Sequence, residues 1–255
     1  MRYCTDVYAI AEMEVRKLLH DPAELLTRAI QPVLWLLVFG QVFASTHAIP
    51  TGDMAYVDFL APGILAQSVL FVAIFYGISV IWERDLGIVH KFLVSPAPRT
   101  ALVLGKGLSA AVRALSQGLI VYAVALFLGV AMDWAASAIF GVLALIVLGA
   151  AIFSTFSLII ACVVKTRERF MGIGQVLTMP LFFASNAIYP TAIMPDWLKA
   201  VAHVNPLTYQ VDGLRALMLA RGTSALGLPL DFSVLTGTLV LLVLCCGWIY
   251  PRIVT

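Results

Sequence analysis

The sequence predicts an all-α polytopic membrane protein with six transmembrane helices, an N-terminal amphipathic interfacial helix and short outer re-entrant helices between spans five and six. Two observations predict this class. The chain is 62% hydrophobic and 12% charged, whereas soluble proteins carry about 25% charged residues. Its apolar residues also gather into six stretches near the ~20 residues that a helix needs to cross a bilayer. We therefore expect residues 1–255 to form a single transmembrane domain.

The first element, residues 1–28, is expected to be a cytoplasmic amphipathic helix at the membrane surface. Its apolar residues cover about one third of a helical wheel, and Asp6, Arg16 and Lys17 lie away from that face. Asp21-Pro22 is typical of a fresh helix start, because Asp caps a helix and Pro suits its first turn. The segment lacks the apolar core of a signal peptide, so we expect no cleavable signal. A simple membrane-surface anchor is the alternative.

The six predicted spans are separated by loops whose charge indicates their side of the membrane. Cytoplasmic loops carry an excess of Lys and Arg. With a cytoplasmic N-terminus, thirteen of the sixteen Lys and Arg residues fall inside, and only Lys199, Arg215 and Arg221 fall outside. We therefore expect a multi-pass protein of the plasma (inner) membrane with both termini in the cytosol. The predicted spans are residues 29–46, 59–82, 108–131, 136–164, 170–190 and 232–250.

The centres of these spans contain no Asp, Glu, Lys, Arg or His, and Arg113 lies near the inner end of the third. A charge at the helix centre costs about 2.5 to 3.5 kcal/mol on insertion scales, and is kept mainly for ion relays, voltage sensing or chemistry. The sequence therefore disfavours a proton-driven antiporter and an intramembrane hydrolase. No disulfide or metal site is expected, because no CxxC pair and no His at ligand spacing accompanies Cys4, Cys162, Cys245 and Cys246.

A charged inner loop, residues 83–106, follows the second span. Residues 88–94 can form a short helix that ends at the prolines of residues 95–98. Such a protrusion suits docking to a cytosolic partner, and an ordinary positive-inside loop is the alternative. The loop opens with three charged residues and a glycine that permits a sharp turn, namely Glu83, Arg84, Asp85 and Gly87.

Residues 191–231 are expected to lie on the outer side and to contain two helices too short to span. Pro190 and Pro195 stop the fifth span. Residues 196–204 can then make the first short helix, in which Trp197 suits the membrane interface. The prolines therefore divide a membrane chain into short interfacial pieces.

The second short helix is expected to start at Asn205-Pro206 and to be closed by Gly222. Asp212 and Arg215 are expected to pair at i,i+3. A separate apolar stripe on this helix consists of Leu207, Val211, Leu214 and Met218.

His203 is a candidate ligand or acid-base group in this outer segment. No second His or Cys stands near it in the sequence, so an interfacial histidine without a catalytic task is the favoured interpretation. Two other classes of function stay open. One is a polytopic membrane enzyme that uses His203 with Asp196 or Asp212, and the other is a non-transporting membrane anchor or assembly subunit.

Two motif regions resemble the membrane subunits of ABC-2-type transporters. They are ERDLGIVHKFLVSP after the second span, and NAIYP, MPDWL and NPLTYQVDGLR before the last. With the six spans and the N-terminal helix, the resemblance runs over nearly the whole chain. It implies that Asn205, Pro206 and Tyr209 belong to an outer re-entrant region. It also implies that residues 1–28 lie beside an ATPase subunit, which is contacted or supported by Glu83, Arg84, Asp85 and Gly87. The family usually has a hydroxyl residue and an acid where Ile88 and His90 stand here.

The chain contains no GxxxxGK[ST] phosphate loop, since Gly105-Lys106-Gly107 lacks the upstream glycine and the following hydroxyl. We therefore expect a transport subunit rather than an enzyme, with no cofactor of its own. The resemblance implies an ABC ATPase partner that binds ATP and Mg²⁺, and it implies export. We expect a second permease subunit in a homodimer and transport by alternating access, and spans without charge indicate an amphipathic or lipid-linked cargo. A net charge of +2 gives no reason to expect a nucleic-acid partner.

Some residues within the spans have two interpretations. The aromatic side chains either line the cargo path or face lipid. The small residues allow close helix approach, either between two copies or within one. The aromatic set is Phe71, Phe75, Tyr76, Phe182 and Phe183, and the small set is Gly107, Ala111, Ala114 and Gly118.

Overall fold

The computed structural model describes residues 27, 30–46, 49–52, 54–86, 99–164 and 166–249. Within these ranges the chain is helical, and its β-structure is an isolated bridge between Met132 and Leu219. Ile30–Thr46 is a continuous helix with a π-helical centre. The elements are η1 (Trp35–Phe39), α3 (Gly40–Thr46), α4 (Tyr56–Asp85), α6 (Arg99–Phe127), α7 (Ala136–Val163), α8 (Arg167–Phe183), η2 (Thr191–Ile193), α9 (Asp196–Val204), α10 (Pro206–Met218) and α11 (Leu228–Ile249).

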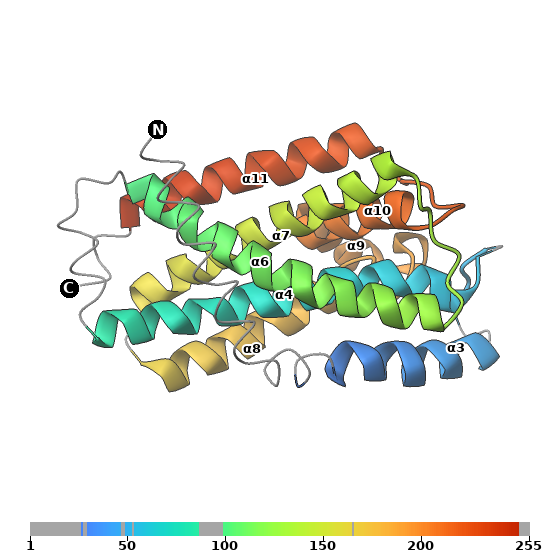
Figure 1. The fold of residues 1–255 in the computed structure, drawn as a ribbon, viewed down its shortest axis with the longest axis horizontal. Coiled ribbons are helices and arrows are strands. Elements are labelled where there is room, and N and C mark those ends of the chain that lie inside the picture. The colour runs from blue at the N-terminus through green and yellow to red at the C-terminus, as the bar shows by residue number, and fades with distance from the viewer. Residues whose placement is uncertain are drawn as a thin grey trace.

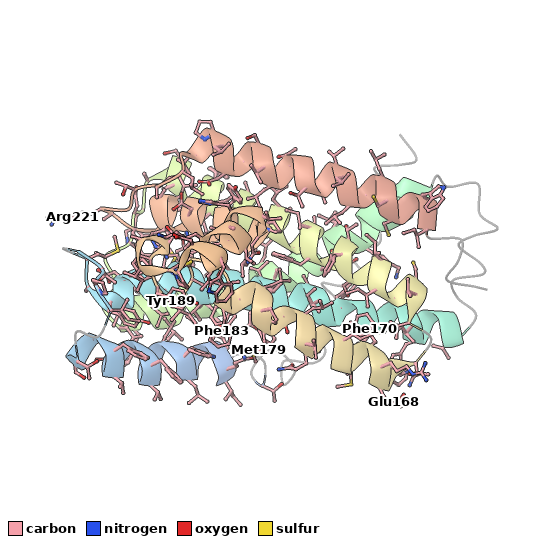
Figure 2. All side chains as sticks on the ribbon, turned by 180° about the vertical axis from the view of Figure 1, so that it is seen from behind. Glu168, Phe170, Met179, Phe183, Tyr189 and Arg221 are labelled. Carbon is pink, nitrogen blue, oxygen red and sulfur yellow. The ribbon has the colours of Figure 1, made fainter. Side chains whose placement is uncertain are left out.

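The long helices run roughly along one common direction, and the short helices α9 and α10 lie together at one end (Figure 1). We refer to this end as the α10 end, which the sequence predicts to be the outer side. Figure 2 shows Arg221 at the α10 end, and Phe170 near the opposite end of α8. The fold therefore separates the loops that the sequence places on the two sides of the membrane.

Four of the described helices, α4, α6, α7 and α11, are long and apolar enough to cross a membrane. They confirm apolar helices at the second, third, fourth and sixth predicted spans. The first and fifth predicted spans are the shorter helix Ile30–Thr46 and the 17-residue α8. Helix α8 ends at Phe183 rather than near residue 190, because the chain turns at Ala184, which caps back onto the carbonyl of Pro180. That the chain crosses the membrane six times stays a prediction.

Helix α4 is the centre of the bundle. In its most apolar window 89% of the residues are buried inside the protein, against 17% in α11. Helix α4 packs against α6, α7, α8 and α10, whereas α11 packs mainly against α7 and α10. Residues on α4 are therefore surrounded by protein on most sides, and α11 presents most of its apolar surface outward.

The small residues of α6 are used for packing inside the subunit. A side chain at Gly118 would lie 3.1 Å from Ile146 and 3.4 Å from Leu65, and one at Gly107 would lie 3.6 Å from Ala151. Ala111 and Ala114 on the same helix are fully buried. This stripe therefore brings α6 close to α7 and α4, which is the second of the two interpretations considered for it.

Both short helices of the outer segment are present, as α9 and α10. The apolar stripe predicted for the second one faces the core, because Leu207, Val211, Leu214 and Met218 are all fully buried. The helix ends at Met218, before the predicted Gly222. Their description as re-entrant stays a prediction. The amphipathic helix of residues 1–28 and the short helix of residues 88–94 lie outside the described ranges, apart from Thr27.

Candidate functional site

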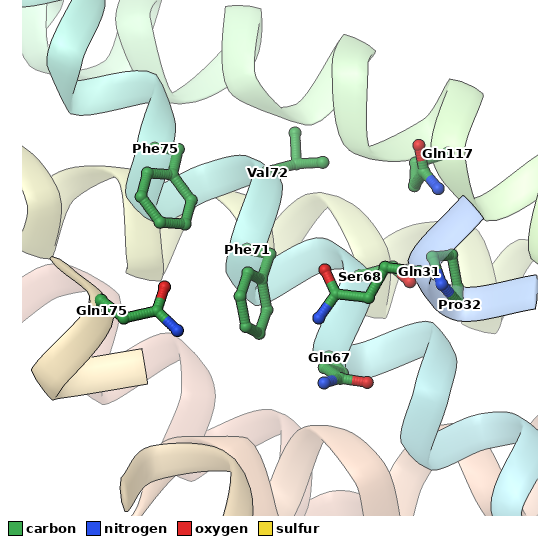
Figure 3. Close-up of a pocket in the computed structure, with 9 residues that line it drawn as sticks. All are labelled: Gln31, Pro32, Gln67, Ser68, Phe71, Val72, Phe75, Gln117 and Gln175. Atoms are coloured by element: carbon green, nitrogen blue, oxygen red, sulfur yellow. The ribbon is translucent and has the colours of Figure 1, made fainter. Parts of the chain in front are cut away.

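A polar cavity lies beside α4, at the depth of the predicted spans. Its volume is about 340 Å³. The walls come from the helix Ile30–Thr46, α4, α6 and α8 (Figure 3). The lining residues are Gln31, Pro32, Gln67, Ser68, Phe71, Val72, Phe75, Gln117 and Gln175.

Helix α4 forms one wall of this cavity. Its contributions are spaced as i, i+1, i+4, i+5 and i+8 from Gln67, so one helix face carries them all. The rings of Phe71 and Phe75 lie one turn apart, with centroids separated by 6.1 Å. Figure 3 shows both rings along α4, with Gln175 on the α8 side and Gln117 on the α6 side. The site therefore combines an apolar strip with amide groups around it.

Gln67 is the most informative residue of the cavity. Its side chain is 3% exposed, and among the described residues its amide has no hydrogen-bond partner. The amides of Gln31 and Gln175 likewise have none there, while the Ser68 hydroxyl donates to the carbonyl of Ile64 at 2.8 Å. The Gln67 amide is therefore available for hydrogen bonding inside the cavity, and the exposed amides of Gln31 and Gln175 are available at its edge.

Among the residues that the structure describes, the lining contains no ionisable side chain. This agrees with the absence of charge from the predicted span centres. The amides themselves were missed by reasoning from the sequence, because that search considered charged residues only. A usable signal is present, since four of the predicted spans each carry one lining glutamine: Gln31, Gln67, Gln117 and Gln175.

The structure divides the five candidate aromatic residues. Phe71 and Phe75 line the cavity. Tyr76 is buried below the guanidinium of Arg113, 5.6 Å from the ring centroid. Phe182 is fully buried, and Phe183 is 43% exposed. Two members of the set therefore belong to the cavity, and the interpretation as path-lining residues does not extend to all of them.

A second polar region lies at the α10 end. We refer to Asn186, Asp212, Arg215, Ser224 and Asp231 as the buried charge cluster. Arg215 is 7% exposed, donates to the carbonyl oxygen of Asn186 at 2.8 Å and lies 3.9 Å from the ring centroid of Phe59. Burial lowers the pKa of Arg215 to about 10, although the negative charge of Asp212 opposes this shift. Arg215 therefore stays a cation at neutral pH.

Asp212 is held by groups that follow α10. It accepts hydrogen bonds from the Ser224 hydroxyl at 2.7 Å and from the backbone N–H of Leu226 at 2.9 Å. The Ser224 hydroxyl also lies 3.0 Å from the carboxylate of Asp231 on α11. The predicted i,i+3 contact between Asp212 and Arg215 is therefore wrong as a direct ion pair, because each side chain turns to other partners.

The structure brings together the residues that the sequence predicts for the outer region. Asn205 caps α10 by accepting from the N–H of Leu207 at 3.0 Å, and its amide donates to two carbonyls at the end of α8, Leu181 at 2.7 Å and Ala184 at 3.1 Å. Pro206 is the first residue of α10. The Tyr209 hydroxyl donates to the carbonyl of His203 at 2.8 Å. This corner joins α8, α9 and α10.

The side chains considered for a membrane enzyme are not assembled. His203 is exposed at the end of α9, and Asp196 lies about 10 Å away along the same helix. Asp196 pairs with Lys199 at 3.6 Å, and Asp212 is buried in α10. No group of three or more His, Cys, Asp and Glu residues placed for a metal occurs within the described ranges.

The predicted contacts with an ATPase cannot be placed in the same way. Residues 83–85 form the last turn of α4, but only their backbone is described, and Gly87 lies outside the described ranges. Their role stays a prediction.

Comparison with known proteins finds transport permeases similar to this chain. The family model for "ABC-2 type transporter" matches residues 5–219. A protein of Cyanophora paradoxa that is named as a transport permease, ycf38, is 27% identical over 219 residues, which is 84% of this chain and 74% of the relative. The daunorubicin resistance ABC transporter permease protein DrrB1 of Streptomyces coeruleorubidus is 27% identical over 204 residues, 78% of this chain and 70% of the relative. The inner membrane transport permease YadH of Escherichia coli is 26% identical over 232 residues, 88% of this chain and 87% of the relative.

Proposed function

The chain belongs to the ABC-2 type transporter family and is a transporter membrane subunit, and from this premise we propose that it exports an amphipathic or lipid-linked cargo. In this proposal two copies form a homodimer in the plasma (inner) membrane. A separate ABC ATPase, which binds ATP and Mg²⁺, drives the dimer between inward-open and outward-open states. The polar cavity is part of the cargo path.

The observation that carries this proposal is the position of Gln67. It stands midway along the apolar span Tyr56–Ile78, is almost fully buried, and has no described partner for its amide. Membrane helices hold such groups toward a protein interior or a water-filled cavity, because lipid cannot satisfy them. A cargo path requires this combination of depth, polarity and unoccupied hydrogen-bonding capacity.

The mouth of the cavity supports a homodimer. Gln31 and Gln175 line the cavity and are also exposed on the surface of the single chain. An amide facing hydrocarbon without a partner is unfavourable. A second copy placed over this face would shield both amides and enclose a shared path, while the small residues of α6 are already used inside the subunit.

Contacts at the end opposite α10 support transmission from the ATPase. The guanidinium of Arg167, at the start of α8, lies 3.7 Å from the ring centroid of Trp82 on α4. Ile81 of α4 and Phe170 of α8 are both fully buried in one hydrophobic cluster there. Helix α4 leads from this cluster into the predicted ATPase contacts, and α8 carries Gln175. Movement of the residue 83–106 loop would therefore displace two walls of the cavity together.

The proposal is tested by ATP-driven transport in membrane vesicles that contain the chain and a co-purified ABC ATPase. The probe is a dodecyl-chain amphiphile with a fluorescent label. We expect transport to require both proteins and ATP, and Gln67→Leu to reduce its rate at least tenfold. The matched control is Gln41→Leu, because Gln41 is exposed on α3 and does not line the cavity. Transport that persists without any ATPase, or equal rates in the two variants, would contradict the proposal.

The coupling residues have a separate test. Glu83→Gln or Gly87→Ala is expected to lower the cargo-stimulated ATPase activity of the assembled transporter and to leave membrane insertion unchanged. The measurement is ATP hydrolysis with and without the probe, alongside the amount of chain in the membrane fraction. Unchanged stimulation in both variants would remove these residues from the ATPase contact.

A further inference from the structure

We propose that the cavity binds the uncharged, hydroxyl- or amide-bearing head group of an amphiphile and rejects charged head groups. This inference rests on the proposed function, since it names the cargo class of the same site.

Most of the hydrogen-bonding capacity of the described lining is that of amides, beside the Ser68 hydroxyl, which donates to the carbonyl of Ile64. Each glutamine amide offers two N–H donors and one carbonyl acceptor, and the amides of Gln31, Gln67 and Gln175 have no partner in the described part of the chain. Hydroxyl and amide groups both donate and accept, so they can satisfy both halves of each side chain. A head group that only accepts, or only donates, would leave half of this capacity unused.

The described part of the lining provides nothing to neutralise a charge, since none of its residues is Asp, Glu, Lys, Arg or His. A buried ion without an opposite charge is strongly disfavoured, because burial removes its hydration and nothing replaces it. The site therefore discriminates by the penalty on charged head groups as well as by its amides.

The aromatic strip and the volume limit which part of an amphiphile enters. Phe71 and Phe75 present two neighbouring rings, which suit the apolar face of a sugar ring or a comparable flat group. A cavity of about 340 Å³ lies at the small end of the roughly 300 to 1,000 Å³ that ligand sites occupy. It holds a head group, and the alkyl chain would leave through the mouth between Gln31 and Gln175.

The test compares three probes that share one alkyl chain: octyl glucoside, octyl trimethylammonium and octyl sulfate. Binding to the purified chain in lipid nanodiscs is measured by calorimetry below the micellar concentration, and the signal of empty nanodiscs is subtracted. We expect the glucoside to bind at least tenfold more tightly than either ion. Gln67→Leu and Gln175→Leu should each weaken glucoside binding about tenfold, whereas Gln41→Leu should leave it unchanged.

Gln67→Glu provides a second, nearly isosteric variant. It adds one acidic group to the cavity, so we expect binding of the trimethylammonium probe to increase and binding of the sulfate probe to fall further. Equal binding of all three probes, or glucoside binding that Gln67→Leu leaves unchanged, would overturn the inference.

Failure of this inference can be separated from failure of the proposed function. ATP-driven transport of a charged amphiphile without glucoside binding would overturn the head-group preference and leave the transporter intact. Glucoside binding that depends on Gln67, in a chain that supports no ATP-driven transport of any probe, would keep the preference and overturn the proposed function.

Discussion

Gln67 in the cavity and Arg215 in the buried charge cluster are both more than nine-tenths buried, with exposures of 3% and 7%, yet protein groups bind the side chain of Arg215 and not the amide of Gln67. The Arg215 guanidinium donates to the carbonyl of Asn186 and lies against the ring of Phe59. Asp212 in the same cluster accepts from a hydroxyl and from two backbone N–H groups. The amide of Gln67 has no partner in the described structure.

This difference separates polar groups that hold the fold from polar groups that are available for exchange. The more costly group, the buried guanidinium of Arg215, has fixed protein partners at Nη2 and at its face, although its Nε has none. The less costly group, the neutral Gln67 amide, has no protein partner in the described structure, and in the proposed function it is desolvated and rehydrated in each cycle at a modest free-energy cost. The charges of Arg215 and Asp212 therefore serve the fold, and the proposed transport function is assigned to amides.

The largest effect on stability is expected at the cluster. Arg215→Met leaves the carbonyl of Asn186 without its donor and removes the cation that interacts with Asp212. Removing one member of a buried charged network costs about 3 to 5 kcal/mol. Unfolding can be followed with a thiol-reactive dye in detergent micelles, in chains in which Cys4 and the exposed Cys245 are replaced by serine, because Cys162 and Cys246 are buried in the folded chain.

The matched control for this variant is Arg221→Met. Arg221 lies at the same end of the protein and is exposed (Figure 2), so its replacement should change the free energy of unfolding by no more than about 0.5 kcal/mol. Similar losses in both variants would show that the cluster is not the structural element described above.

An intermediate effect is expected at Asn205, which joins α10 to the end of α8. Asn205→Ala removes the cap and both donated hydrogen bonds, and should cost about 2 kcal/mol. Asn205→Ser keeps a capping oxygen and should recover about 1 kcal/mol of that loss. The same unfolding assay measures both variants. No difference between them would mean that the cap contributes nothing and that the bonds to α8 account for the whole loss.

The sequence predicts the apolar helices well where a continuous apolar stretch is long enough to cross a membrane. Helices α4, α6, α7 and α11 stand where predicted spans lie, and the start of α10 follows directly from Asn205 as cap and Pro206 in the first turn. The end of α8 was missed, because it depends on a turn at Ala184 that the amide of Asn205, distant in the sequence, stabilises. Local composition does not contain that contact.

The cavity could be predicted only in part. Phe71 and Phe75 were among the candidates, but the sequence gives no reason to prefer them over Phe182, whose ring packs edge-on against Trp35 with centroids 5.8 Å apart. Likewise, Asp212 and Arg215 satisfy the helical spacing rule, and only the loop after α10 and the carbonyl of Asn186 draw them to different partners. Spacing predicts which residues share a helix face, whereas packing decides which hydrogen-bond partner each side chain contacts.

The smallest effect on stability is expected at Gln67, and this variant decides the comparison. Gln67→Leu replaces an unpartnered amide by an apolar group of similar size, so no protein hydrogen bond is lost. The free energy of unfolding should change by less than about 1 kcal/mol in either direction, because the amide lines the cavity and has no protein partner in the described structure. A loss above about 2 kcal/mol in the thiol assay would mean that the protein itself holds this amide. Near-wild-type stability together with lost transport assigns Gln67 to the cargo, because the amide then contributes to what passes through the cavity and not to the fold around it.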